Sequence, residues 1–95
     1  MTHTPRFRIH DVAMLIYKFL KDNKDKLKYN IFNDGLYKVT SKQIKKSLFN
    51  SYNFTHYSTI GNAMTLLHEM GLIEIVKRYP MYGNRKTVYV FKIKN

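Results

Sequence analysis

Residues 60–73 read IGNAMTLLHEMGLI, and this stretch decides the fold. Four apolar residues keep the period of an α-helix and predict a helix with one side on a core: Ile60, Ala63, Met64 and Leu67. Gly71 is placed to end this helix, because glycine readily adopts the left-handed conformation of the C′ position. Leu72 and Ile73 then lead into a segment of strand-forming residues, so the stretch predicts a helix that turns directly into a β-strand.

The segment after Gly71 predicts a β-hairpin. Leu72–Tyr79 and Thr87–Lys94 are rich in Ile, Val, Tyr and Phe, and Pro80–Lys86 between them has turn-forming residues. The basic residues of this unit are Lys77 and Arg78 on the first strand and Arg85 and Lys86 at the tip.

A second helix is predicted before residue 50. Thr40 is a good N-cap, Gln43 takes the capping-box position, and Val39 can pack on Ile44 as a hydrophobic staple. A short strand is expected at Tyr37–Val39. Lys42, Lys45 and Lys46 fall on the solvent side of the helix.

The first helix is predicted to begin at Asp11, a good N-cap residue, after an extended arm over residues 1–10. Its core stripe is expected to comprise Val12, Leu15, Ile16, Phe19 and Leu20. Met14 and Tyr17 lie roughly opposite that stripe, and the strand 87–94 has two apolar faces at the expected edge of the sheet. These features predict a homodimer, while the alternative is that Met14 and Tyr17 are isolated surface residues.

The order helix, short strand, helix, helix and basic hairpin resembles the winged helix-turn-helix family, notably small regulators of archaea and archaeal viruses. The resemblance implies an α+β domain over residues 11–94, with three helices and a small antiparallel β-hairpin wing. It also implies a transcription regulator that binds double-stranded DNA. The third helix, about residues 55–70, would then enter the major groove, and the wing, about residues 79–87, would contact phosphates or the minor groove.

The outer side of the third helix is polar and suits this role. Ser58, Asn62 and Thr65 fall opposite the core stripe, with Thr59 on the flank, and all four are predicted base contacts. Asn can bind adenine N6 and N7 together, and Thr can contact thymine, so sites containing A·T pairs are favoured. A merely solvated helix face is the alternative. The predicted backbone contacts are Lys42, Lys45, Lys46, Lys77, Arg78, Arg85 and Lys86.

Composition agrees with a nucleic-acid partner. Seventeen Lys and Arg against six Asp and Glu give a formal charge of +11, which a polyanion would offset. There is no cysteine, and the four histidines lack the spacing of a metal site. We expect no enzyme activity, cofactor, metal, small-molecule substrate or membrane contact, and a cytoplasmic location. The alternatives are an RNA- or ribosome-binding winged helix and a protein-interaction module.

Overall fold

A computed structural model describes residues 8–29, 35–48, 57–81 and 86–94 of the chain. Over these residues it is an α+β structure with three helices and one three-stranded antiparallel sheet. The elements in chain order are α1 (Ile9–Asp22), β1 (Tyr37–Thr40), α2 (Ser41–Leu48), α3 (Tyr57–Glu69), β2 (Ile73–Met81) and β3 (Lys86–Ile93). The sequence therefore predicted the α+β class and the order of these elements correctly.

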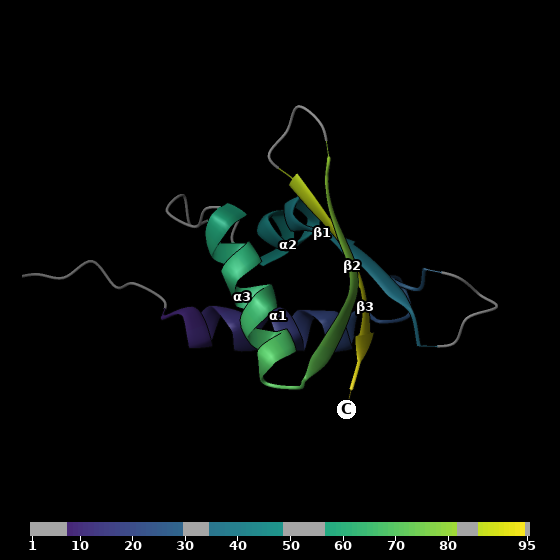
Figure 1. The fold of residues 1–95 in the computed structure, drawn as a ribbon, viewed down its shortest axis with the longest axis horizontal. Coiled ribbons are helices and arrows are strands. Elements are labelled where there is room, and N and C mark those ends of the chain that lie inside the picture. Colours follow the sequence, from purple (N-terminus) through teal and green to yellow (C-terminus); the bar gives the residue numbers. More distant parts are fainter. Residues whose placement is uncertain (1–7, 30–34, 49–56, 82–85, 95) are drawn as a thin grey trace, which may run out of the picture.

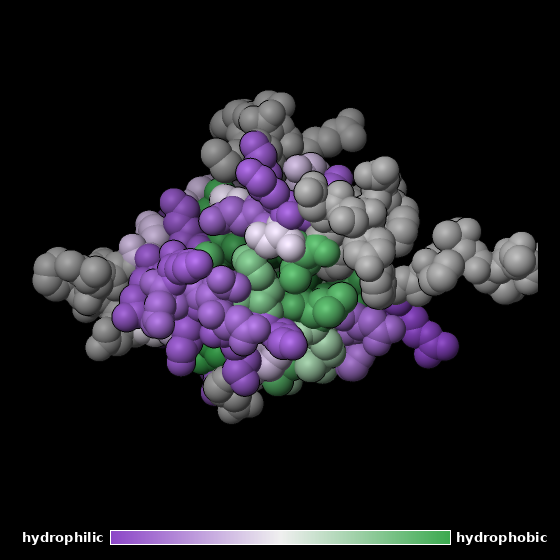
Figure 2. Space-filling view, turned by 180° about the vertical axis from the view of Figure 1, so that it is seen from behind, coloured by the Kyte–Doolittle hydropathy of each residue, from purple (hydrophilic) through white to green (hydrophobic). Residues whose placement is uncertain are grey.

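The three helices lie on one face of the sheet, with α3 crossing α1, and β2 and β3 run on past the helices (Figure 1). Side chains from all three helices and from the inner face of the sheet form one core. Seen from behind, hydrophilic residues gather on the side where the sheet lies, and an apolar area occupies the middle of the face (Figure 2). None of the described helices has the length and apolar character that a bilayer crossing requires.

Helix α1 begins earlier than predicted and is turned differently about its axis. It starts at Ile9, so Asp11 lies in the first turn instead of at the N-cap, and residues 9 and 10 are not part of an arm. Its buried residues are Val12, Ala13, Ile16, Tyr17 and Leu20. At 100° per residue, the centre of this arc lies about 60° from the centre of the predicted stripe. Leu15, predicted as core, is instead 38% exposed.

The rotation of α1 overturns one predicted dimer residue. Tyr17 is only 8% exposed and belongs to the core, so its ring is unavailable as an outer surface. Lys21 Nζ lies 5.2 Å from the centroid of the Tyr17 ring. Met14 is 38% exposed, as predicted. An aromatic residue at the border of a helical stripe can be placed on either side by a small rotation of the helix, and here it faces the core.

The start of α2 carries the predicted capping box. The backbone N–H of Gln43 donates to Thr40 Oγ1 over 3.1 Å, and the N–H of Thr40 donates to Gln43 Oε1 over 2.8 Å. Both pairs satisfy backbone donors that lack helical partners. Ser41, 1% exposed, accepts a hydrogen bond from the backbone N–H of Thr87 through its Oγ over 2.9 Å. This bond fixes the beginning of α2 against the first residues of β3, at the end of the hairpin next to the connection.

The turn from α3 into β2 is a Schellman motif, as the placement of Gly71 suggested. Gly71 has φ +76°, its N–H donates to the His68 carbonyl over 3.1 Å, and the N–H of Leu72 donates to the Leu67 carbonyl over 3.1 Å. His68 Nδ1 accepts a further bond from the backbone N–H of Ile75 over 3.0 Å. The end of α3 and the start of β2 are thus joined at several points.

Strand β3 is the central strand of the sheet, not its edge. The strand order is β1-β3-β2, because β1 pairs with β3 through Tyr37 opposite Phe91. The prediction that a twin chain covers one apolar face of an edge strand is therefore wrong. Val88 and Val90, on the face away from the helices, are 3% and 4% exposed within the single chain.

Two other predictions fall outside the described residues. One is the first part of the predicted third helix, residues 55 and 56, since α3 is described from Tyr57. The other is the hairpin tip with Arg85. Lys86 begins β3, but its side chain is not described. Since β2 continues to Met81 and β3 begins at Lys86, the connection is shorter than predicted and comprises residues 82–85.

Candidate nucleic-acid interface

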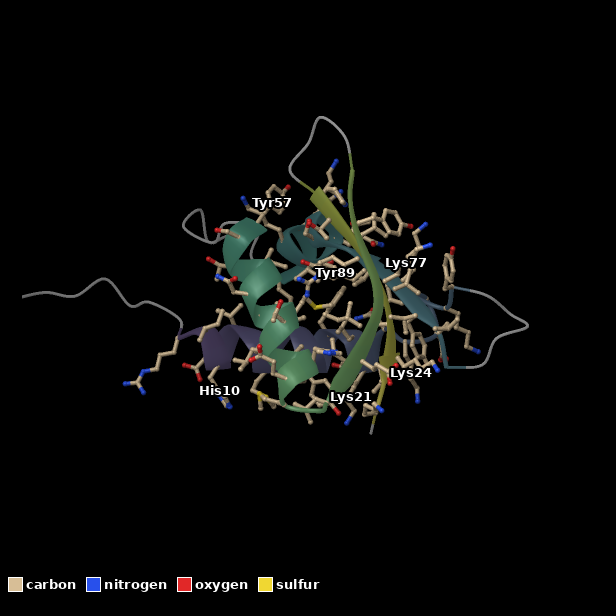
Figure 3. All side chains as sticks on the ribbon, viewed as in Figure 1. His10, Lys21, Lys24, Tyr57, Lys77 and Tyr89 are labelled. Carbon is tan, nitrogen blue, oxygen red and sulfur yellow. The ribbon has the colours of Figure 1, made fainter. Side chains whose placement is uncertain are left out.

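A groove of about 600 Å³ lies between the outer side of α3 and the β2–β3 hairpin. Nine residues from α2, α3, β2 and β3 line it: Lys45, Tyr57, Ser58, Gly61, Asn62, Thr65, Arg78, Thr87 and Tyr89. Figure 3 shows Tyr57 at the beginning of α3 and Tyr89 between α3 and the strands. The groove is therefore built from the face of α3 that the sequence marks as polar.

Three of the four predicted base contacts meet in this groove. Ser58, Asn62 and Thr65 line it, because spacings of four and three residues place them on one side of the helix. Ser58 and Asn62 are exposed. Thr59 is half-buried on the flank of α3 and does not line the groove.

Thr65 is engaged within the protein. Its Oγ1 donates to the Gly61 carbonyl over 3.0 Å and accepts a hydrogen bond from Arg78 Nη2 over 2.8 Å. Since the only hydroxyl proton points back to the helix, Thr65 holds Arg78 in place more readily than it donates to a base.

Arg78 is exposed on β2 and leans against α3. Besides its bond to Thr65, its guanidinium carbon lies 5.5 Å from the centroid of the Tyr89 ring, within cation–π range. The Tyr89 ring beneath Arg78 and the hydrogen bond to Thr65 of α3 restrict the Arg78 side chain, which would otherwise move freely. The groove that Asn62 lines thus also holds an oriented guanidinium, although α3 itself carries no arginine.

A β-bulge gives Arg78 this orientation. Ile75 pairs with Phe91 but Lys77 pairs with Val90, so Val76 is an extra residue in β2. Without the bulge, strict alternation would place residue 77 on the face of Ile75 and turn residue 78 away from α3. Instead Arg78 shares the inner face with Tyr89, and Lys77 lies on the side of the strands away from α3 (Figure 3). These two neighbours, predicted together as backbone contacts, belong to opposite faces.

Among the lysines of α2, only Lys45 lines the groove. Its Nζ lies 4.8 Å from the centroid of the Tyr57 ring, which steadies the side chain at the groove margin. Lys42 and Lys46 are exposed elsewhere on α2. The groove therefore has a cation at each side, Lys45 from α2 and Arg78 from β2.

No carboxylate of the described residues lines the groove. Glu74, near the other end of the sheet, forms an ion pair with Lys94 over 3.1 Å, and the hydrogen bond and charge of Lys94 lower the pKa of Glu74. The groove consequently presents two fixed cations, hydroxyls and one side-chain amide. Such a set can donate hydrogen bonds to phosphate oxygens and to base acceptors.

Tyr89 and Gly61 shape the floor of the groove. Tyr89 is 2% exposed, and burial raises the pKa of its phenol, although the nearby Arg78 charge opposes that effect. A Cβ at Gly61 would lie 3.4 Å from the Tyr89 hydroxyl oxygen. The glycine thus allows the Tyr89 hydroxyl to approach α3 closely, and a larger residue would fill the space between them.

The sequence did not single out Tyr57, Thr87 and Tyr89. Alternation along β3 could have placed Tyr89 on the face of Phe91, but only the pairing with β2 shows that Arg78 lies over it. Within the described ranges, His, Asp and Glu side chains form no group of three that could hold a metal ion.

Comparisons of the chain with protein-family models, with curated proteins and with solved structures give no match.

Proposed function

We propose that this protein is a winged helix-turn-helix protein that binds double-stranded DNA and acts as a transcription regulator. Helix α3 enters the major groove, which is about 12 Å wide and accepts one helix. The β2–β3 hairpin, which runs on past the helices, is the wing (Figure 1). In this proposal the DNA is bound without being chemically altered, and no cofactor takes part.

The observation that carries the proposal is that Arg78 and Asn62 line the same groove, to which no described residue contributes a carboxylate. Arg binds guanine O6 and N7 with its two parallel N–H groups, and Asn binds adenine N6 and N7. Because Arg78 is held by Thr65 and Tyr89, less side-chain freedom is lost when it binds. We infer that the recognised site contains both a G·C pair and an A·T pair.

Charge supports the same partner. The formal charge of +11 favours association with a polyanion, and Lys45 at the groove margin is placed to meet a phosphate beside the bases. A two-fold dimer on a palindromic site stays a prediction, and of its two α1 residues only Met14 is exposed.

The test is a titration of labelled duplex DNA and of duplex RNA of the same sequence, each over a range of salt concentrations. We expect tighter binding to DNA, because the major groove of A-form RNA is too narrow for side chains to read. The logarithm of the binding constant should fall linearly with the logarithm of the salt concentration. Tighter RNA binding would instead support the RNA- or ribosome-binding function. If neither duplex DNA nor duplex RNA shows salt-sensitive binding, the remaining function is that of a protein-interaction module.

A further inference from the structure

The face of the sheet away from the helices carries a second set of cations. Register places Lys38 of β1 and Lys77 of β2 on either side of Val90 of β3. One pair further along, Thr40 and Tyr79 flank Val88 in the same way. Paired residues share a face, so these side chains form two cross-strand rows, and we call this surface the outer sheet face.

Lysine dominates the outer sheet face. Lys38, Lys77 and Lys92 are all exposed. The carboxylate described on this face is Glu74, opposite Lys92, and it is already paired with Lys94. A shallow groove of about 350 Å³ continues the face beyond β1, lined by Lys26, Leu27, Lys28, Tyr29, Lys38 and Gln43. Cations therefore extend across the sheet and past its edge.

The apolar residues at the centre of the outer sheet face are buried. Val88 and Val90 are almost fully buried, although they lie outside the main core. The described helices lie on the opposite face of the sheet (Figure 1). The neighbours in register on β1 and β2, Lys38 and Lys77 beside Val90 and Thr40 and Tyr79 beside Val88, are placed to cover them. Because strands are about 4.8 Å apart, Lys38 and Lys77 are roughly 10 Å apart at their Cα atoms. A buried apolar floor with spaced cations is suited to a charged backbone that lies across it.

We propose that the outer sheet face binds the phosphate backbone of a second DNA duplex, so that one protein molecule bridges two duplexes. The charge is complementary, and the described side chains of this face include no Arg or Asn that could read bases. Lysine contacts phosphate as a point charge, so this contact is independent of sequence. The bridging, but not the outer contact itself, depends on the proposed function of the α3 groove.

The neighbours Lys77 and Arg78 separate the two surfaces. The bulge at Val76 turns Arg78 toward α3 and Lys77 toward the outer sheet face. Variants of the outer face can therefore be made without touching the α3 groove. Lys38→Gln with Lys77→Gln removes two cations and keeps side chains that still cover Val90. Lys18→Gln with Lys24→Gln is the matched control, because both lysines are exposed and lie in α1 and the turn after it.

The experiment measures capture of a fluorescent duplex by a second duplex fixed on beads, with the full chain added below duplex saturation. We expect capture by the wild type and by the control, and at least tenfold less capture by the Lys38/Lys77 variant. Affinity for a single duplex through the preferred site should change less than threefold. The salt slope for capture should decrease by about 1 for each phosphate that no longer has a lysine partner.

Two results would overturn the bridging proposal: no capture by the wild type, or equal capture by the Lys38/Lys77 variant and the control. A protein dimer would bridge through two α3 grooves and give the second result. A different set of results is expected if the α3 groove does not bind DNA at all. In that case Arg78→Ala and Asn62→Ala would leave single-duplex binding unchanged, while loss of Lys38 and Lys77 would still weaken it.

Discussion

Arg78 on β2 and Thr65 on α3 are joined by a hydrogen bond of 2.8 Å between Nη2 and Oγ1. The bond connects the proposed reading helix to the proposed wing at the point where both line one groove. Thr65 donates its own proton to the Gly61 carbonyl, so the guanidinium, not the hydroxyl, is the donor available to a ligand. The position and orientation of Arg78 in the groove are therefore linked to an α3 residue.

Arg78→Lys tests whether the planar guanidinium is needed. Lysine keeps the charge but loses the paired donors that match guanine O6 and N7. We expect a loss of about 1–3 kcal/mol in binding free energy on the preferred site, and little change on random duplex DNA. Fluorescence anisotropy with both duplexes measures this difference. Equal losses on the two would make Arg78 a phosphate contact.

Gly61→Ala is expected to raise the stability of the fold while it lowers the affinity for DNA. Alanine favours a helix interior by about 0.5–1 kcal/mol over glycine, and its Cβ would meet Tyr89 Oη at 3.4 Å, an ordinary contact distance. The free energy of unfolding, measured in urea, should therefore rise. DNA affinity should fall about tenfold, equivalent to about 1.4 kcal/mol, because a methyl group is added to the lining of the groove at Gly61. Unchanged affinity would show that DNA does not approach α3 at this residue.

Thr40→Ala removes the N-cap of α2, and about 0.5–2 kcal/mol of unfolding free energy should be lost. For a domain of this size each kcal/mol corresponds to about 4–8 °C in melting temperature. Gln43→Ala should cost less, because it removes only the reciprocal bond to the Thr40 N–H. A melting temperature unchanged by both substitutions would contradict the capping box.

Tyr89→Phe should alter the alkaline stability of the protein. Burial raises the Tyr89 pKa above its ordinary value of 10.0, so the unfolded chain loses this proton first as the pH rises. The protonated phenol therefore stabilises the fold fully at pH values below 10.0. This stabilisation is lost as the pH rises toward the pKa of Tyr89 in the folded protein, by at most about 1.4 kcal/mol per pH unit. Urea unfolding at about pH 9 and about pH 11 should show a larger loss for the wild type than for Tyr89→Phe. An equal loss would mean that the phenol titrates alike in the folded and unfolded protein.

The features predicted correctly from the sequence are those that depend on neighbours along the chain. The Thr40–Gln43 capping box and the Gly71 turn are each determined within a few residues, and the buried residues of α3 follow from one helical period. The polar groove-lining residues Ser58 and Asn62 follow from the same period.

The features that were missed depend on contacts between distant segments. Tyr17 is buried because packing in the folded chain rotates α1, which its own sequence does not specify. Strand β3 is central because residues 37–40 pair with residues 88–91 across most of the chain. The bulge at Val76 changes the face of every later residue of β2, and nothing in the composition of that strand marks it.

The most direct test of the account is the binding of Asn62→Ala to a preferred duplex, obtained by selection from random sequences, and to an unselected duplex. If α3 reads bases in the major groove, the variant should lose about 1–3 kcal/mol on the preferred duplex and far less on the unselected one. The exposed position of Asn62 predicts an unchanged melting temperature as the control. Unchanged binding of Asn62→Ala to both duplexes would contradict the placement of α3 in the groove.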